Sequence, residues 1–464
     1  MIRLLLGLLL MLNAGALAAA GPPAPAPAPL SELVERVDIP FETFTLDNGL
    51  RVVVHTDRKA PVVSVNVWYH VGSVDEPKGR SGFAHLFEHI MFRGSKHSRQ
   101  DHFRPLEEAG ATQMNGTTDF NRTNYFQTVP TPALELALFL ESDRMGFLEP
   151  VIDEAVLASE RDIVLNEKRD GENAPGGLLF PALLAALYPP DHPYSIPAIG
   201  REPDLRAATV ADARGWFRTH YGPNNAVLVL AGDIDVKTAR PLVERWFGQI
   251  PPGPRPPRFA APVPERRETT RQTIRDRVAT VRLVRAWALP GEAAPGMTDL
   301  DVGLATLGAG PTSLLFDRLV RAERLAVAVS AGLSGFEGAS LATISAEVRP
   351  GVDPDVVERR IDELLAQWMA AGPDADEVAR VATRAVASTI RGLEQVGGFG
   401  GKGQALAAGM VFANDPGDYR RQLAELAAVT PASVKAAANR WLAGGEHRLR
   451  LEPGERDPVT IDAP

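Results

Sequence analysis

Two histidines and a glutamate lie in one short stretch of this chain, at a spacing that could hold a metal ion and activate water. In Gly82–Met91, which reads G-F-A-H-L-F-E-H-I-M, His85 and His89 are four residues apart and Glu88 directly precedes the second histidine. In a helix these three side chains share an arc of about 100°. Two neutral imidazoles and a third ligand from elsewhere make a catalytic zinc site with a position left for water. Glu88 is too close in sequence to be that third ligand and is placed to act as the base on the water.

The same stretch could instead be a helix that turns a polar stripe toward solvent. Its other positions include Phe83, Leu86, Phe87 and Ile90, so we expect a helix buried on most sides, with Ser81 as its N-cap. The polar stripe of such a helix must face a group that needs it. Because H-x-x-E-H arises by chance in a chain of this length on the order of 1% of the time, the metal interpretation is favoured.

A carboxylate from a second helix is expected to complete the site, because catalytic two-histidine zinc sites usually add one. A helix is predicted over Glu154–Arg169, with Asp153 as its N-cap, and it carries two candidates, Glu160 and Glu167. Seven residues apart, they lie about 20° apart around the helix axis, on a face that is otherwise apolar. An unpaired buried charge is costly unless a cation meets it, so this face indicates a metal or a cation. The alternative is that the helix is more exposed than its pattern suggests.

Composition narrows the chemistry. The chain has 464 residues, of which 45% are hydrophobic and 23% charged, which is typical of a globular protein with room for two or more cores. The net charge of −9 gives no indication of nucleic-acid binding. The absence of cysteine excludes thiolate ligands, disulfides and a thiol nucleophile, so histidine and carboxylate alone must hold any metal.

The N-terminus resembles an export signal. Arg3 is followed by an apolar run and small residues, which predicts a signal peptide over 1–20, cleaved after Ala18 or Ala20 and too short for a stable membrane span. A linker rich in proline and alanine is expected over 21–37. We therefore predict a periplasmic location; an uncleaved anchor and another secretory compartment are the alternatives.

Periodicity predicts an α+β fold built from two tandem homologous halves. Strands are expected at 41–46, 50–55 and 61–70, one or two strands at 115–128, and helices at 132–147 and 154–169. A capped helix followed by a strand occurs at 209–230 and again at 430–451, which indicates a duplication. Each half should be an α/β sandwich of mixed or antiparallel strands with helices packed on it.

The predicted domain boundaries follow from this repeat. Residues 38–248 are expected to form an N-terminal zinc-bearing domain, and 266–464 a homologous domain without a metal site. Between them, 249–265 contains seven prolines and no periodicity, and is expected to be an interdomain linker. The glycine-rich stretch 397–403, G-G-F-G-G-K-G, lacks the Ser or Thr of a phosphate loop and is expected to be a flexible break between helices.

The motifs together resemble a known family. H-L-F-E-H, followed about seventy residues later by E-R-D-I-V-L-N-E, is similar to the inverted-motif zinc peptidases: pitrilysin, insulysin and the mitochondrial processing peptidase, in their small-subunit bacterial branch. Further matches occur in the family's order: G-S-V-D-E-P, F-R-G-S, A-T-Q-M-N-G-T-T, H-P-Y-S-I-P-A-I-G and Y-G-P-N-N-A-V-L-V-L-A-G-D. The resemblance implies one zinc ion per chain, held by His85, His89 and Glu167, with Glu88 as the base of a metalloendopeptidase.

Two further roles are implied by the resemblance. Glu160 would orient a metal ligand from outside the coordination shell. Asn115, on an edge strand, would hydrogen-bond the backbone of a substrate that binds as an added β-strand, which favours extended or unfolded peptides, including presequence-like segments.

One departure from the family bears on its partners. Active members of this branch carry an arginine and a tyrosine in the second half that reach the active site, but Leu314 and Val327 stand at those positions here. Neither side chain can donate a hydrogen bond to an oxyanion. We therefore expect a heterodimer whose homologous partner lacks H-x-x-E-H and supplies the Arg/Tyr pair. A self-sufficient homodimer and a non-catalytic peptide-binding scaffold are the alternatives.

Overall fold

The computed structural model describes residues 29–256, 258 and 262–456. The expected signal peptide (1–20) lies outside the described residues. Within the expected 21–37 linker, helix α1 (Leu30–Glu35) contacts helix α14 (Asp418–Ala428) from near the other end of the chain. In these ranges, no helix combines the length and the apolar character needed to cross a membrane.

The first half of the chain builds a six-stranded sheet, here called the N-terminal sheet. In spatial order its strands are β1 (Glu42–Thr45), β2 (Arg51–Thr56), β6 (Ala226–Gly232), β3 (Val62–Tyr69), β5 (Thr123–Pro130) and β4 (Thr112–Thr118). The first three expected strands are β1 to β3, each displaced by one residue at either end, and the 115–128 stretch resolves into β4 and β5. Because β4 is the last strand of this sheet, one side of its backbone is open to pairing.

The second half builds a five-stranded sheet, here called the C-terminal sheet. In spatial order its strands are β7 (Thr270–Asp276), β11 (His447–Pro453), β8 (Arg282–Pro290), β10 (Ala339–Val348) and β9 (Ala326–Gly335). The order β7-β11-β8-β10-β9 repeats β2-β6-β3-β5-β4 of the first half strand for strand. The pairing directions repeat as well, because β2 with β6 and β7 with β11 are parallel while their other neighbours are antiparallel.

The repeated helix that precedes the last strand of each half begins in the same way. Thr209 caps α8 (Val210–His220) ahead of β6, and Thr430 caps α15 (Pro431–Trp441) ahead of β11, each through a capping box. The predicted fold class, α+β with two similar halves, is confirmed. The boundaries 38–248, 249–265 and 266–464 remain predictions.

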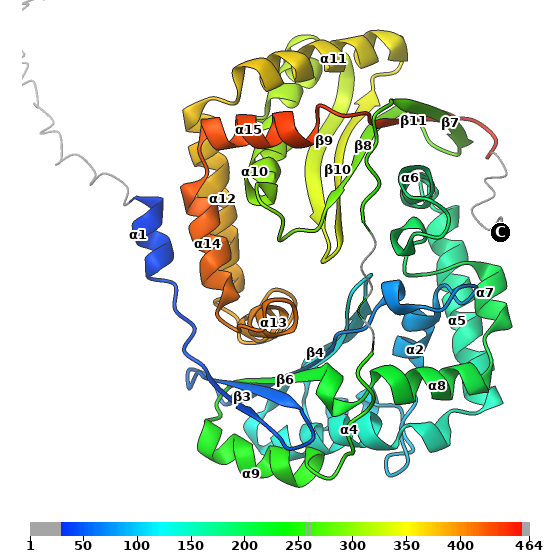
Figure 1. Cartoon of the computed structure of the whole chain (residues 1–464), viewed down its shortest axis with the longest axis vertical. Helices are drawn as coiled ribbons and strands as arrows, with labels where there is room; N and C mark the ends of the chain where they lie inside the picture. Colours follow the sequence, from blue (N-terminus) through cyan, green and yellow to red (C-terminus); the bar gives the residue numbers. More distant parts are fainter. Residues whose placement is uncertain (1–28, 257, 259–261, 457–464) are drawn as a thin grey trace, which may run out of the picture.

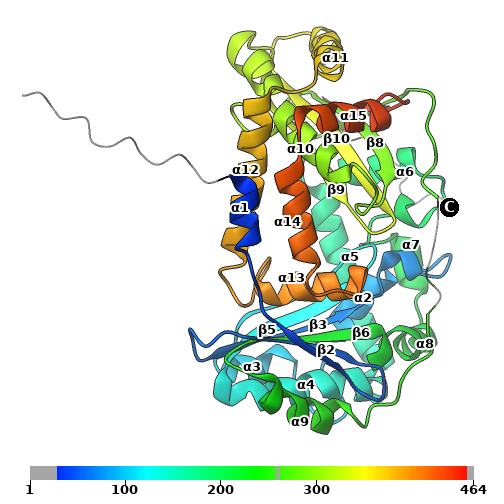
Figure 2. The ribbon, with the colours of Figure 1, turned by 60° about the vertical axis from the view of Figure 1, so that its left-hand side comes forward.

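Each half covers the outer face of its own sheet with long helices and sends one short helix to the other sheet (Figures 1 and 2). The outer layers consist of α4 (Leu134–Phe147) and α9 (Val236–Phe247) in the first half, and α10 (Met297–Gly308), α11 (Pro354–Ala371), α12 (Ala375–Gly392) and α15 in the second. In exchange, α6 (Leu179–Leu187) packs on β8 and β11, and α13 (Lys402–Ala408) packs on β3 and β6. Two smaller core clusters, around α6 and around α13, therefore contain residues of both halves, whereas the main cluster of each half contains only its own.

The glycine-rich stretch lies between α12 and α13, as the expected break between helices, and it packs closely against the N-terminal sheet. A Cβ on Gly397 would lie 2.2 Å from Thr128 Oγ1, and one on Gly403 would lie 2.5 Å from Asn66 Nδ2. Both glycines are buried. The sequence pattern could not reveal this because the contacting strands lie more than half the chain away.

Candidate metal centre

Helix α2 (Phe83–Ile90) carries the two histidines, and a carboxylate six residues before its N-cap accepts hydrogen bonds from its first turn. The expected cap, Ser81, was wrong: the N-cap is Gly82, which has no side chain to accept the first amides. Glu76 replaces it, since its two carboxylate oxygens accept hydrogen bonds from Gly82 N (3.1 Å) and Ala84 N (2.8 Å). Burial raises the pKa of Glu76 well above its usual value, and these backbone hydrogen bonds only partly offset that rise.

Close packing fixes the start of this helix. Gly82 has φ +84°, and a Cβ there would lie 2.7 Å from Ile199 O and 2.9 Å from Gly200 Cα. The hydroxyl of Ser81 instead donates to Asp204 (2.5 Å), in the first turn of α7 (Glu202–Ala207). Helix α2 is thus held from both sides of its N-terminus, which sets the direction of its histidines.

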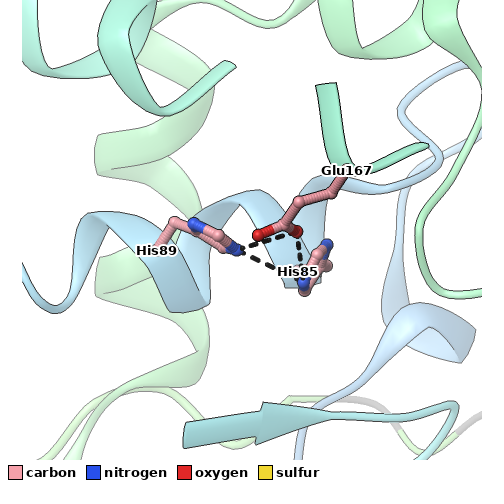
Figure 3. Close-up of side chains that lie close together, drawn as sticks. All are labelled: His85, His89 and Glu167. Carbon is pink, nitrogen blue, oxygen red and sulfur yellow. Dashed lines mark hydrogen bonds and ion pairs between the residues drawn. The ribbon is translucent and has the colours of Figure 1, made fainter. Parts of the chain in front are cut away.

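Helix α5 (Glu154–Asn173) brings the expected third carboxylate to these histidines. Its predicted N-cap is confirmed, because Asp153 accepts a hydrogen bond from Val156 N (2.9 Å). The helix packs against α2 and places Glu167 opposite both histidines (Figure 3). The Nε2 atoms of His85 and His89 are 3.3 Å apart, and Glu167 Oε2 lies 3.8 Å and 3.5 Å from them, respectively.

Two of these separations, 3.3 Å and 3.5 Å, match the ligand spacing around a tetrahedral metal ion, and the third, 3.8 Å between His85 and Glu167, is slightly longer. Two ligands at about 2.0–2.2 Å from such an ion are roughly 3.3–3.6 Å apart. The donor set of two imidazole nitrogens and one carboxylate oxygen is the set found in catalytic zinc sites that keep a water position open. Among the described residues, no other group of three His, Asp or Glu side chains brings its ligand atoms so close together.

The two histidines have different protonation tendencies. Burial, with a small contribution from His89, lowers the pKa of His85 to about 4, so its ring is neutral and free to bind a metal at pH 7. Burial also lowers the pKa of His89, but the carboxylates of Glu160, Glu167 and Glu88 outweigh it and the net shift is upward. A metal must therefore displace a proton from His89 but not from His85.

Glu160 lies behind His89 rather than beside Glu167. It is 2% exposed, and its Oε2 is 3.8 Å from His89 Nδ1, while its other oxygen accepts a short hydrogen bond from Arg93 Nε. This arrangement can orient the His89 ring through the nitrogen that faces away from Glu167. The matching nitrogen of His85, Nδ1, is buried without a hydrogen-bond partner in the described part of the chain.

Glu88 lies in the same cleft with a partner that the sequence analysis missed. Its carboxylate is buried and accepts a hydrogen bond from the hydroxyl of Thr118 (2.6 Å), at the end of β4. Burial raises the pKa of Glu88, and Thr118, His89 and Arg122 only partly offset this rise. A carboxyl with a raised pKa can take up and return a proton near neutral pH. Thr118 closes the string A-T-Q-M-N-G-T-T, which was its only signal.

Asn115 lies on the open edge of the N-terminal sheet beside these groups. It shares with His85, Glu88 and Glu167 an open cleft of about 370 Å³. Next to it, a Cβ on Gly116 would lie 2.7 Å from the Phe92 ring, so only glycine lets β4 approach the end of α2 this closely. The edge position is as expected, and the contact with substrate remains a prediction.

Comparisons with known proteins place the chain in a family. Residues 51–196 match the family model described as Insulinase (Peptidase family M16), and residues 207–384 match the one described as Peptidase M16 inactive domain. An uncharacterized zinc protease of Mycobacterium leprae (strain TN) is 31% identical over 330 residues, which cover 69% of this chain and 72% of that protein. The chain belongs to peptidase family M16. The predicted kinship with pitrilysin-like peptidases is confirmed.

Other M16 proteins agree in sequence and in fold. Zinc protease PqqE of Helicobacter pylori is 28% identical over 396 residues, covering 83% of this chain and 87% of that protein. The crystal structure of a protease from Helicobacter pylori has a TM-score of 0.81 at 24% identity, and covers 89% of this chain and all of that one. The periplasmic protease PqqL from Escherichia coli has a TM-score of 0.74 at 18% identity over 92% of this chain and 50% of its own.

The two positions that depart from the family pattern lie in the second half. Leu314 is half-buried against the core beneath the C-terminal sheet, and Val327 is 38% exposed on β9, the edge strand equivalent to β4. Neither offers a polar atom to a substrate.

Proposed function

We propose that this M16 chain is a zinc-dependent metalloendopeptidase, with one zinc ion held by His85, His89 and Glu167. The observation that carries the proposal is the convergence of these three ligand atoms to within 4.8 Å of one another, although Glu167 lies more than seventy residues after both histidines and on another helix. The names of its relatives as zinc proteases support the choice of metal.

The roles of the surrounding side chains follow from their contacts. When bound, zinc would lower the pKa of a water toward about 7 and polarise a peptide carbonyl. Glu88 takes the proton from the attacking water and returns it to the leaving nitrogen, which its raised pKa allows. Thr118 donates a hydrogen bond to one oxygen of Glu88, which leaves the other oxygen to accept the proton of the water. Glu160 orients His89, and Glu76 holds the first turn of α2.

The substrate is an extended or unfolded peptide that pairs with the open edge of β4. A strand added there places its backbone beside Asn115 and its carbonyl groups over the cleft that contains Glu88. A folded domain keeps most of its strands paired and blocks its sheet edges, whereas an extended peptide offers its whole backbone, which is the reason for the preference.

The chain acts with a homologous partner that supplies an arginine and a tyrosine, because Leu314 and Val327 cannot stabilise an oxyanion. The similarity to a periplasmic protease and the apolar N-terminus support a periplasmic location. Assay of the purified chain alone tests the partner: full activity without one would contradict the heterodimer and favour a homodimer.

Hydrolysis of a quenched fluorescent peptide tests the enzyme itself. Zinc-loaded wild type, mixed with the partner where one is required, should cleave the peptide, and Glu88→Gln should lose about 10³-fold or more in kcat. Asp170→Asn removes an exposed carboxylate from α5 and is the matched control. Peptide binding with no turnover that depends on Glu88 would instead support a non-catalytic scaffold.

A further inference from the structure

The glycine-rich segment 397–403 presents one large apolar side chain that neither the core nor the proposed chemistry uses. Phe399 is 66% exposed, the highest value among the large exposed apolar residues of the described chain. Its ring meets Phe126 edge to face, with centroids 5.0 Å apart. Single exposed apolar side chains are common on protein surfaces, so the role of Phe399 depends on where it lies relative to the cleft.

The segment around Phe399 is anchored on both sides. Lys402 forms an ion pair with Asp57 (2.5 Å), and both side chains are at most 10% exposed. The backbone closes on itself through hydrogen bonds from Lys402 N to Gln395 O (2.9 Å) and from Gly403 N to Val396 O (3.0 Å). These contacts fix the backbone next to Phe399. The loop conformation therefore keeps the Phe399 side chain exposed.

The anchored segment sits directly on the edge strand of the cleft. A Cβ on Gly398 would lie 3.0 Å from the Gln113 amide, and Gln113 is where β4 contains a bulge, with φ +52°. Phe126, whose ring contacts that of Phe399, is the direct cross-strand neighbour of Asn115. Opposite residues of a strand pair point to the same face, so Asn115, Phe126 and Phe399 lie on one face of the sheet.

A strand added to β4 presents every second side chain to that face. We propose that Phe399 forms a subsite for an apolar side chain of the bound peptide, on the same face as Asn115 and next to the metal cleft. This inference rests on the proposed function, because it requires a peptide on β4. It assigns to the glycine-rich segment a part in selecting substrates: peptides with apolar residues at alternate positions bind more tightly than their polar counterparts.

Peptide affinity in the zinc-loaded Glu88→Gln chain, which does not consume the peptide, tests the subsite. Two labelled unstructured peptides that differ only in Leu against Ser at alternate positions are compared by fluorescence anisotropy. Adding Phe399→Ala should weaken binding of the Leu peptide about 10-fold and that of the Ser peptide less than about twofold, while Phe399→Leu restores most of the difference. Phe180→Ala, a change at another exposed phenylalanine on α6, should affect neither peptide.

The outcomes separate the subsite from the proposed function. If the peptides bind but Phe399→Ala weakens both equally or neither, the subsite is wrong and the peptidase proposal stands. If neither peptide binds the parent chain, both the subsite and the proposed peptidase function are contradicted. A lower thermal midpoint for Phe399→Ala than for Phe180→Ala would assign Phe399 a structural role and overturn the subsite.

Discussion

Phe120 and Phe336 meet edge to face with ring centroids 4.7 Å apart, and they occupy equivalent turns in the two halves of the molecule. Phe120 lies between β4 and β5, and Phe336 lies between β9 and β10, the strands that correspond to them in the repeated topology. Backbone and side-chain contacts reinforce the pair, since Asn121 accepts a hydrogen bond from Glu337 N (3.2 Å). The second half thus holds the end of the edge strand that carries Thr118.

This contact should be measurable as a coupling. Phe120→Ala and Phe336→Ala in a double-mutant cycle, followed by denaturant unfolding, should give an interaction free energy of about 0.5–1.5 kcal/mol. Hydrogen exchange at residues 118–123 should accelerate in Phe336→Ala. Additive losses and unchanged exchange would show that the two turns are neighbours without energetic consequence.

The second prediction concerns Glu76, which caps α2. Glu76→Ala leaves the amides of Gly82 and Ala84 without an acceptor and should cost about 1–2 kcal/mol in the free energy of unfolding, with weaker zinc binding because the histidines lose their orientation. Glu76→Gln keeps an acceptor oxygen and should cost less than half as much. Equal losses for the two variants would mean that charge, rather than hydrogen bonding, is what the helix needs from this residue.

Zinc binding should release a proton near neutral pH. The raised pKa of His89 leaves the apo ring partly protonated at pH 7, and a metal ligand must be neutral, so affinity should fall as pH drops through neutrality. His85, with a pKa of about 4, contributes no proton there. Glu160→Gln removes a carboxylate that raises the His89 pKa and should reduce the release. Calorimetry in two buffers of different ionisation enthalpy measures the proton count, and a count unchanged by Glu160→Gln would contradict this assignment.

The hydrogen bond from Thr118 should set the acid limb of the rate profile. Thr118 lowers the pKa of Glu88, so Thr118→Val should raise it, and the pH at which Glu88 becomes an effective base should move upward. The acid limb of kcat/KM for the quenched peptide therefore shifts to higher pH, whereas Thr118→Ser keeps the wild-type limb. A fall in rate at every pH with no shift would place the effect of Thr118 in structure alone.

Sequence patterns correctly predicted the features that depend on residues close together in the chain. The strands β1 to β3, the helix carrying His85 and His89 and the N-cap at Asp153 each depend on residues close together in sequence. The shared helical face of Glu160 and Glu167 was also readable, because seven residues make nearly two turns. The pattern did not show which of the two glutamates lies at the metal-binding nitrogens of the histidines. The packing of α5 against α2 places Glu167 at His89 Nε2 and Glu160 at His89 Nδ1.

The missed features all depend on contacts between distant segments. Glu76 displaces Ser81 as the cap because Ser81 is engaged by Asp204, which no local motif indicates. The close packing of Gly397 against Ser64 and Thr128 also joins segments far apart in the sequence. Sequence periodicity also did not predict that α6 and α13 each pack on the sheet of the other half. Periodicity indicates how much of a helix is buried, but it does not identify the segment that buries it.

The zinc content and affinity of the purified chain test the central claim most directly. We expect one zinc ion per chain in wild type and in Asp170→Asn, a change on the same helix as Glu167. The affinity should be at least about 100-fold weaker in Glu167→Gln, which loses one of the three protein ligands. A chain that binds no zinc, or a Glu167→Gln variant that binds it as tightly as wild type, would contradict the metal centre on which the proposed hydrolysis rests.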